Sequence, residues 1–216
     1  MRIFTRLSIV LLALSGSAFL FGQQPEKTWS DEEAARVVHS VQENLSSLSH
    51  FAVFDWITFG IKGKTIVLKG YASRPIVKDE AGAVVKNVTG VESVDNQIEL
   101  LSLSPNDDRI RVAVYNRIYT NPALSRYNAN QGSVARALAP WPNAAVRAGG
   151  ITNSPPMGYH AIHIIVNNGH VILYGVVASS MDSEMAEIMA NGAPGAFSID
   201  NQIVTERHDQ GHRELK

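Results

Sequence analysis

Residues 54–99 read FDWITFGIKGKTIVLKGYASRPIVKDEAGAVVKNVTGVESVDNQIE, and residues 159–204 read YHAIHIIVNNGHVILYGVVASSMDSEMAEIMANGAPGAFSIDNQIV. The two stretches align without a gap. Two glycines in each stretch are identical, Gly70 with Gly175 and Gly90 with Gly195. An Asp-Asn-Gln-Ile run is also shared, at 95–98 and 200–203. The chain is therefore a tandem repeat, and both copies are expected to share one fold.

Hydrophobic spacing in the first copy predicts the element order helix, strand, strand, helix, strand. A capping-box pattern at Ser30 and Glu33 starts the first helix. Gly63-Lys64 turns a β-hairpin whose first strand runs from Asp55 to Ile61. The second helix carries an apolar stripe from Val77 to Val88 and is expected to end at Gly90, before a last strand over 94–100.

The second copy repeats this order. Asn106, Asp107 and Asp108 open its first helix, Asn168-Gly169 is a strong hairpin signal, and the remaining helix and strand are expected at 181–193 and 197–204. The sequence thus predicts an α+β fold of two tandem αββαβ domains, each a three-stranded sheet with two helices on one face. A domain of roughly 75 residues buries only about 60% of its unfolded surface, so each copy gains stability by packing against the other.

We place the first domain at 29–101, the second at 105–205, and a polar tail at 206–216. The second domain carries an insertion at about 128–157, between its first helix and first strand, which contains Arg136, Trp141 and Arg147. A long segment with little regular pattern is usually functional or disordered.

Residues 1–23 form a signal-peptide pattern, with Arg2 and Arg6 ahead of the apolar run 7–14 and small residues at 16–18. Export to the periplasm is the expected fate. The alternative is an uncleaved membrane anchor, but serines and glycines interrupt a span shorter than the ~20 apolar residues that a crossing needs. The chain has no cysteine, which excludes disulfides, thiol chemistry and a lipid-modified N-terminal cysteine.

Composition and motifs argue against several functions. A formal net charge of −1 does not supply the positive field that nucleic-acid binding requires. The stretch 58–65 resembles a phosphate-binding loop but leads into a strand, whereas such a loop must open a helix. We find no catalytic motif, and neither the histidines at 160, 163 and 170 nor those at 208 and 212 make a convincing metal site. We therefore expect no enzyme, no metal and no cofactor, with a hydrolase as the most distant alternative.

The repeated stretches resemble the BON family, a small domain of bacterial envelope proteins that binds phospholipid membranes or other envelope components. The resemblance rests on the strand endings 63–70 and 168–175 and on the closing segments 90–98 and 195–203. It implies an exported, non-enzymatic module with the αββαβ fold. The insertion departs from a minimal domain of this family.

The outer face of the second sheet is mostly apolar, although a solvated antiparallel face should be polar. Either the first copy or the insertion with Trp141 is expected to cover it, or it binds lipid or a partner. The first copy's outer face, with Phe54, Trp56 and Tyr71, is also aromatic, so a face-to-face tandem is possible.

We expect the protein to bind envelope phospholipid or an envelope protein, with peripheral membrane association. A protein adaptor or holdase-like stress protein is the alternative. The candidate contact residues are aromatic, basic or imidazole side chains of the second copy: Tyr127, Arg136, Trp141, Arg147, Tyr159, His163 and Tyr174. Four glycines, Gly70, Gly90, Gly175 and Gly195, and the twin Asp-Asn-Gln runs are expected to serve the fold.

Overall fold

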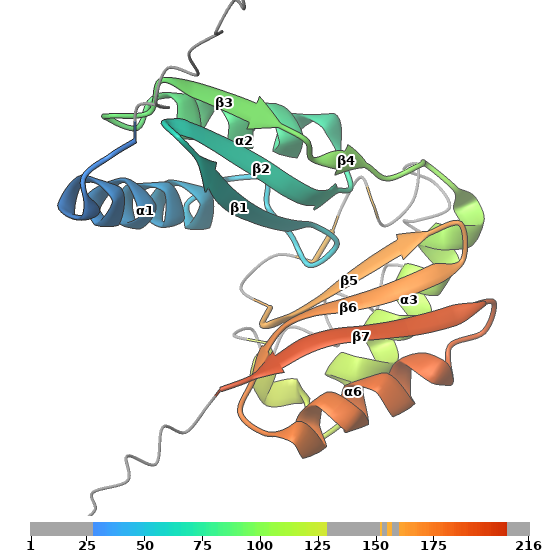
Figure 1. The fold of residues 1–216 in the computed structure, drawn as a ribbon. Coiled ribbons are helices and arrows are strands. Elements are labelled where there is room, and N and C mark those ends of the chain that lie inside the picture. Colours follow the sequence, from blue (N-terminus) through green and yellow to red (C-terminus); the bar gives the residue numbers. More distant parts are fainter. Residues whose placement is uncertain (1–27, 129–151, 153–154, 157–159, 207–216) are drawn as a thin grey trace, which may run out of the picture.

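The computed structural model describes residues 28–128, 152, 155–156 and 160–206. Two domains follow one another along the chain (Figure 1). The first contains α1 (Asp31–Ser46), β1 (Trp56–Lys62), β2 (Thr65–Ala72), α2 (Pro75–Lys86), β3 (Ser93–Asn96) and β4 (Glu99–Leu100). The second contains α3 (Pro105–Tyr119), the 3-10 helix η1 (Ser125–Tyr127), β5 (Ile162–Asn167), β6 (His170–Val177), α6 (Ser180–Asn191) and β7 (Ser198–Thr205). The predicted α+β fold class is confirmed.

In each domain the middle strand of the sheet pairs in two directions. β2 is antiparallel to β1 across the Gly63-Lys64 turn and parallel to β3 and β4, because α2 carries the chain back to the start of the sheet. β6 pairs with β5 and β7 in the same way. The third strand of the first domain is split into β3 and β4, whereas β7 runs unbroken.

Each sheet buries one face beneath two helices, which lie on one side of it in Figure 1. In the first domain Val41 of α1, Leu68 of β2 and Ala81 of α2 are fully buried in one core. In the second, Val114 of α3 and Leu173 of β6 occupy the matching core. The predicted apolar stripes therefore face inward in both copies.

Several predicted boundaries differ from the structure, and three of them have a local structural cause. α2 ends at Lys86, and Gly90 lies beyond it with a φ of 96° in the turn toward β3. β1 begins at Trp56, because the Asp55 carboxylate is buried in the preceding turn. α3 begins at Pro105, where Ser104 is the N-cap and accepts the Asp107 N–H, so the expected start at Asn106 was late.

Gly70 and Gly175 occupy equivalent positions in the two central strands, and both need the absence of a side chain. Their φ angles are 117° and 138°, which L-residues rarely adopt. A Cβ atom at Gly70 would overlap the carbonyl oxygen of Trp56, and one at Gly175 would overlap that of Ala161. The expected close backbone packing is confirmed.

The twin Asp-Asn-Gln runs have a shared structural role. The side-chain amide of Asn96 donates to the Lys78 carbonyl of α2, and that of Asn201 donates to the Ser183 carbonyl of α6. Gln97 N–H donates to Leu68 of β2, so by strand alternation the next N–H, that of Ile98, points to the open edge of the sheet. Asn96 Oδ1 accepts it at 3.3 Å, and Asn201 Oδ1 accepts the N–H of Ile203 at 3.2 Å. Each asparagine thus ties its edge strand to a helix and occupies an edge N–H that could otherwise pair with another chain.

We expect Gly175→Ala to lower the free energy of unfolding by about 2 kcal/mol or more, because the methyl group overlaps a backbone carbonyl and φ is positive. Urea unfolding measures the change. Gly60→Ala is the matched control in an exposed strand position with no atom within 4 Å of the added Cβ. Equal stability of the two variants would contradict this account of Gly175.

Candidate functional site

The two sheets meet through five side chains that we call the aromatic interface: Phe51, Trp56, Tyr71, His163 and Tyr174. Trp56 and Tyr71 are cross-strand partners on the outer face of the first sheet, and His163 and Tyr174 are partners on the outer face of the second. Trp56 stacks on Tyr174 with ring centroids 5.1 Å apart and planes 2° apart. Tyr71 lies 6.5 Å from Tyr174, and His163 lies 5.2 Å from Phe51 and 5.3 Å from Trp56. Of the covers expected for this face, contact with the first copy is present at His163 and Tyr174, while Trp141 of the insertion lies outside the described residues.

The segment before β1 enters the second domain. Val53 and Phe54 are both 0% exposed. They belong to the core of the second domain, which α3, β5, β6 and α6 form, and not to the core of the first. The Phe54 ring meets Tyr115 edge-on at 6.4 Å. The N–H of Ile164 in β5 donates to the Val53 carbonyl at 2.8 Å. Phe54 was expected on the outer face of the first sheet, and this expectation is wrong because the chain turns toward β5 before β1 begins.

A buried carboxylate fixes that turn. Asp55 accepts hydrogen bonds from Ala52 N–H at 2.9 Å and from the N–H and hydroxyl of Ser73 at 2.6 and 2.7 Å. Burial raises the pKa of Asp55, and these three bonds oppose the rise. The contacts join the segment 51–55 to the junction of β2 and α2, so the first domain holds Phe54 in position for the second.

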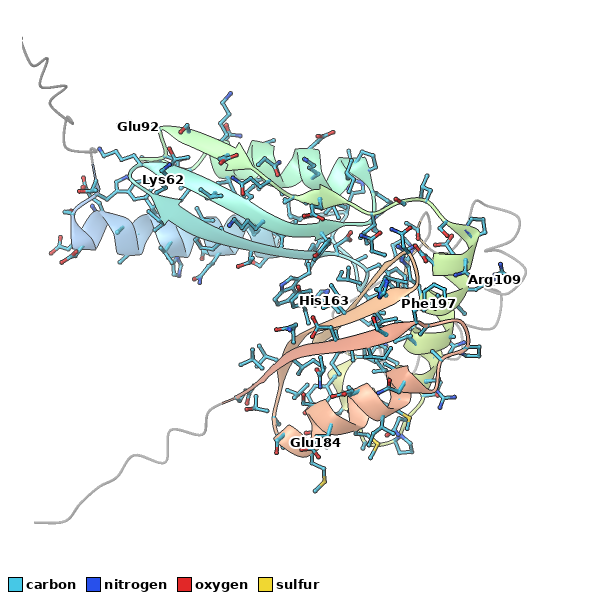
Figure 2. The ribbon with its side chains drawn as sticks, turned by 45° about the vertical axis from the view of Figure 1, so that its right-hand side comes forward. Lys62, Glu92, Arg109, His163, Glu184 and Phe197 are labelled. Atoms are coloured by element: carbon cyan, nitrogen blue, oxygen red, sulfur yellow. The ribbon has the colours of Figure 1, made fainter. Side chains whose placement is uncertain are left out.

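His163 lies between the two domains and is 9% exposed (Figure 2). Its Nδ1 atom has no hydrogen-bond partner among the residues that the structure describes. Burial lowers the pKa of His163 to about 4, against a smaller opposing effect of the nearby backbone of Ala52 and Asp55. At neutral pH the ring is therefore uncharged and packs as an aromatic side chain.

The second domain buries an arginine that sequence periodicity did not reveal. Arg111 of α3 is 0% exposed, and its guanidinium donates to Asp108 at 2.9 Å, to Thr152 at 2.8 Å and to the Val166 carbonyl at 2.7 Å. Burial lowers the pKa of Arg111, and the Asp108 carboxylate opposes that effect. Because Thr152 also donates to Asp108, this group fastens a residue of the predicted insertion to α3.

Two buried tyrosines of α3 lie beside the strand that follows the insertion. Tyr115 Oη and His160 Nε2 are 3.0 Å apart, and Asn128 donates to the same hydroxyl at 3.3 Å. Tyr119 donates to the Ile162 carbonyl at 2.6 Å. Burial raises the pKa of Tyr115 to about 12, so its phenol stays protonated and is not a general base at neutral pH. An isolated bridge pairs Asn128 with His160 and brings the two ends of the insertion together.

The candidate contact residues separate into three groups. His163 and Tyr174 contact the first domain. Tyr127 is half-buried, donates to Asp182 at 2.8 Å and accepts the Ala178 N–H at 2.9 Å. Arg136, Trp141, Arg147 and Tyr159 lie outside the described residues.

The outer face of the second sheet is covered only in part. Ile165 is fully buried there, whereas Val176 and its parallel partner Val204 are 48% and 61% exposed. Other exposed apolar side chains are Met181 and Ile188 of α6, at 73% and 58%, and Phe197 immediately before β7, at 75%. Met181 and Ile188 are seven positions apart on one helical face. Met181 and Ile188 were not singled out in the sequence, because an apolar residue at a surface position has the same pattern as a core residue.

Within the described parts of the chain, no helix is long and apolar enough to cross a membrane. The same residues contain no cluster of three potential metal-binding side chains. The described side chains between the two sheets pack against one another, with stacked rings and a neutral histidine.

Comparison with known families gives two matches to the BON domain, at residues 60–102 and 150–207. The first match omits α1 and the start of β1. No curated protein matches the chain significantly. Two solved structures of CdsD, a structural protein of the Type III secretion system of Chlamydia trachomatis, are similar to it at 15% and 14% identity. They cover 78% and 82% of this chain and 91% and 98% of their own, with TM-scores of 0.24 and 0.23, and likenesses at this level do not bear on function.

We expect Trp56 and Tyr174 to be energetically coupled across the domains. In a double-mutant cycle with Trp56→Ala and Tyr174→Ala, the interaction term in the free energy of unfolding should be about 0.5–1.5 kcal/mol, because the rings stack. Trp29 is the matched control, since it bonds to Gly90 within the first domain. Trp29→Ala and Tyr174→Ala should be additive within about 0.5 kcal/mol. A vanishing Trp56–Tyr174 term would contradict the stacked interface.

Proposed function

Because the chain carries two BON domains in tandem, we propose that it is an exported, non-catalytic binding module that associates with envelope phospholipid from the periplasm. The doubled family match carries the proposal. Resemblance to this family implies a binding module of envelope proteins. The signal-peptide pattern of residues 1–23 supports export. Because formal charge is only −1, attraction to anionic lipid must come from local groups, not from the net field.

The insertion of the second domain supplies the proposed lipid contacts. Trp141 has the amphipathic ring that favours the membrane interface, and Arg136 and Arg147 have the charge that phosphate headgroups attract. This choice rests on sequence, since all three lie outside the described residues. Of the other candidates in the described parts, His163 and Tyr174 pack against the first domain, and the Tyr127 hydroxyl is already bonded to Asp182.

One observation favours a protein adaptor or holdase as the second candidate function. Met181 and Ile188 expose an apolar helical face, and flexible methionine side chains adapt to varied partners. Suppression of the aggregation of unfolded clients, without any vesicle binding, would support this function over the lipid module.

We expect the chain from residue 24 onward to float with vesicles that contain anionic phospholipid, and to float less as salt is raised. The triple variant Arg136→Gln, Trp141→Ala, Arg147→Gln should bind at least about 10-fold more weakly, because roughly 1 kcal/mol is lost per basic residue near the surface and the interfacial ring is also removed.

The control for net charge is the double variant Arg36→Gln, Arg109→Gln, which removes the same number of cations from exposed positions on α1 and α3. It should bind as the unmodified chain does. Equal losses in the two variants would show that net charge, not the insertion, governs binding. Absence of flotation with any vesicle would overturn the lipid proposal.

A further inference from the structure

We propose that His163 makes the docking of the two domains pH-dependent: the neutral imidazole holds them face to face, and its protonation in acid weakens that contact. His163 lies at the contact between the domains, so this pH dependence is the same whether the ligand is lipid or protein.

The His163 ring lies between the two domains. His163 projects from β5 toward the first domain (Figure 2). The rings of Phe51 and Trp56 lie 5.2 and 5.3 Å away, tilted by 51° and 53°. Both neighbours belong to the first domain, so the environment of this imidazole exists only while the domains are docked.

Hydrogen bonding also bears on the charge of the ring. Protonation gives the imidazole an N–H at both nitrogens. Nδ1 is buried and forms no hydrogen bond among the described residues, and the backbone of Ala52 and Asp55 near the ring offsets only part of the effect of burial. The charge would also lose its hydration, since the ring is 9% exposed. Attraction of the cation to the two aromatic rings opposes this cost. Burial lowers the pKa of His163 to about 4, in the direction that the position of the ring leads us to expect.

The groups around the ring do not provide a counter-charge. On its own side, His160 adds positive charge that lowers the pKa of His163 further. From the segment before β1, the carboxylate of Asp55 is engaged by Ala52 and Ser73. β6 and β2 contribute Tyr174 and Tyr71, and burial raises the pKa of Tyr174, so its phenol stays neutral. No salt bridge to His163 is present in the described parts of the chain.

The direction of the effect follows from proton linkage. Once the domains separate, His163 is hydrated and its pKa returns toward the ordinary value of about 6.5. Between these two values the separated state binds the proton more readily, so docking is complete above pH ~6.5 and weakens as pH falls toward ~4. Relative to neutral pH, the equilibrium between docked and separated domains shifts toward separation by about 30-fold at pH ~5 and by at most ~300-fold at lower pH. Weaker docking exposes the stacked rings of Trp56 and Tyr174 to partners.

The absence of cysteine from the sequence makes the domain separation measurable. Lys62→Cys on the hairpin of the first domain and Glu184→Cys on α6 introduce two exposed labelling positions, one in each domain (Figure 2). Energy transfer between dyes at these sites, followed through urea titrations of the full-length chain, reports the equilibrium between docked and separated domains. We expect this equilibrium to shift about 30-fold toward separation between pH ~7.5 and pH ~5.

His163→Phe keeps an aromatic ring that does not titrate, and its equilibrium should change by less than about threefold over the same range. His163→Gln is the second variant, in case phenylalanine disturbs packing. His39→Gln is the matched control, because His39 is exposed on α1 and pairs with Glu43 away from the interface, and it should retain the full shift. A His163 variant with the unmodified pH dependence, or an NMR titration of the native chain that places the pKa of His163 above ~6, would overturn the proposal.

Discussion

The rest of the structure depends on the segment 53–56, which places side chains in the second domain before it begins the first strand of the first domain. Phe54 lies in the core of the second domain, while two residues later Trp56 begins β1 of the first. The buried Asp55 between them is bonded to Ala52 and Ser73, so the first domain fixes the direction in which Phe54 enters the second. Each unit is small, and a shared core compensates for the limited surface that either can bury alone. The stacking of Trp56 on Tyr174 continues that contact over the sheet faces.

The two copies use the same sequence features to build their sheets and different features to meet. Gly70 and Gly175 admit a close carbonyl oxygen, and Asn96 and Asn201 join an edge strand to its helix. The contact between the copies, in contrast, is asymmetric: the first contributes Trp56 and Tyr71, and the second contributes His163 and Tyr174.

Repeat alignment and periodicity predicted the fold class and the element order, because these depend on patterns within a few residues of one another. They indicated that the aromatic face needs a cover, but not which segment supplies it. They did not predict where Phe54 lies, since alternation assigns a residue to a face of its own strand and carries no information on a turn toward another domain. Arg111, Tyr115 and Tyr119 were missed for a related reason: polar side chains are counted as exposed unless their partners are known, and Val166, His160 and Ile162 are distant in sequence. The residues assigned to lipid contact, such as Trp141, lie outside the described parts and stay predictions.

Amide hydrogen exchange of a Phe54→Ala variant tests most directly whether the two domains form one unit. Phe54 precedes the first strand of the first domain in the chain, but its side chain is fully buried in the core of the second. Truncation to alanine should therefore lower the free energy of unfolding of the second domain by about 3–5 kcal/mol. The account predicts faster exchange throughout β5, β6 and β7, with β2 and α2 less affected. Loss of protection confined to the first domain would contradict it.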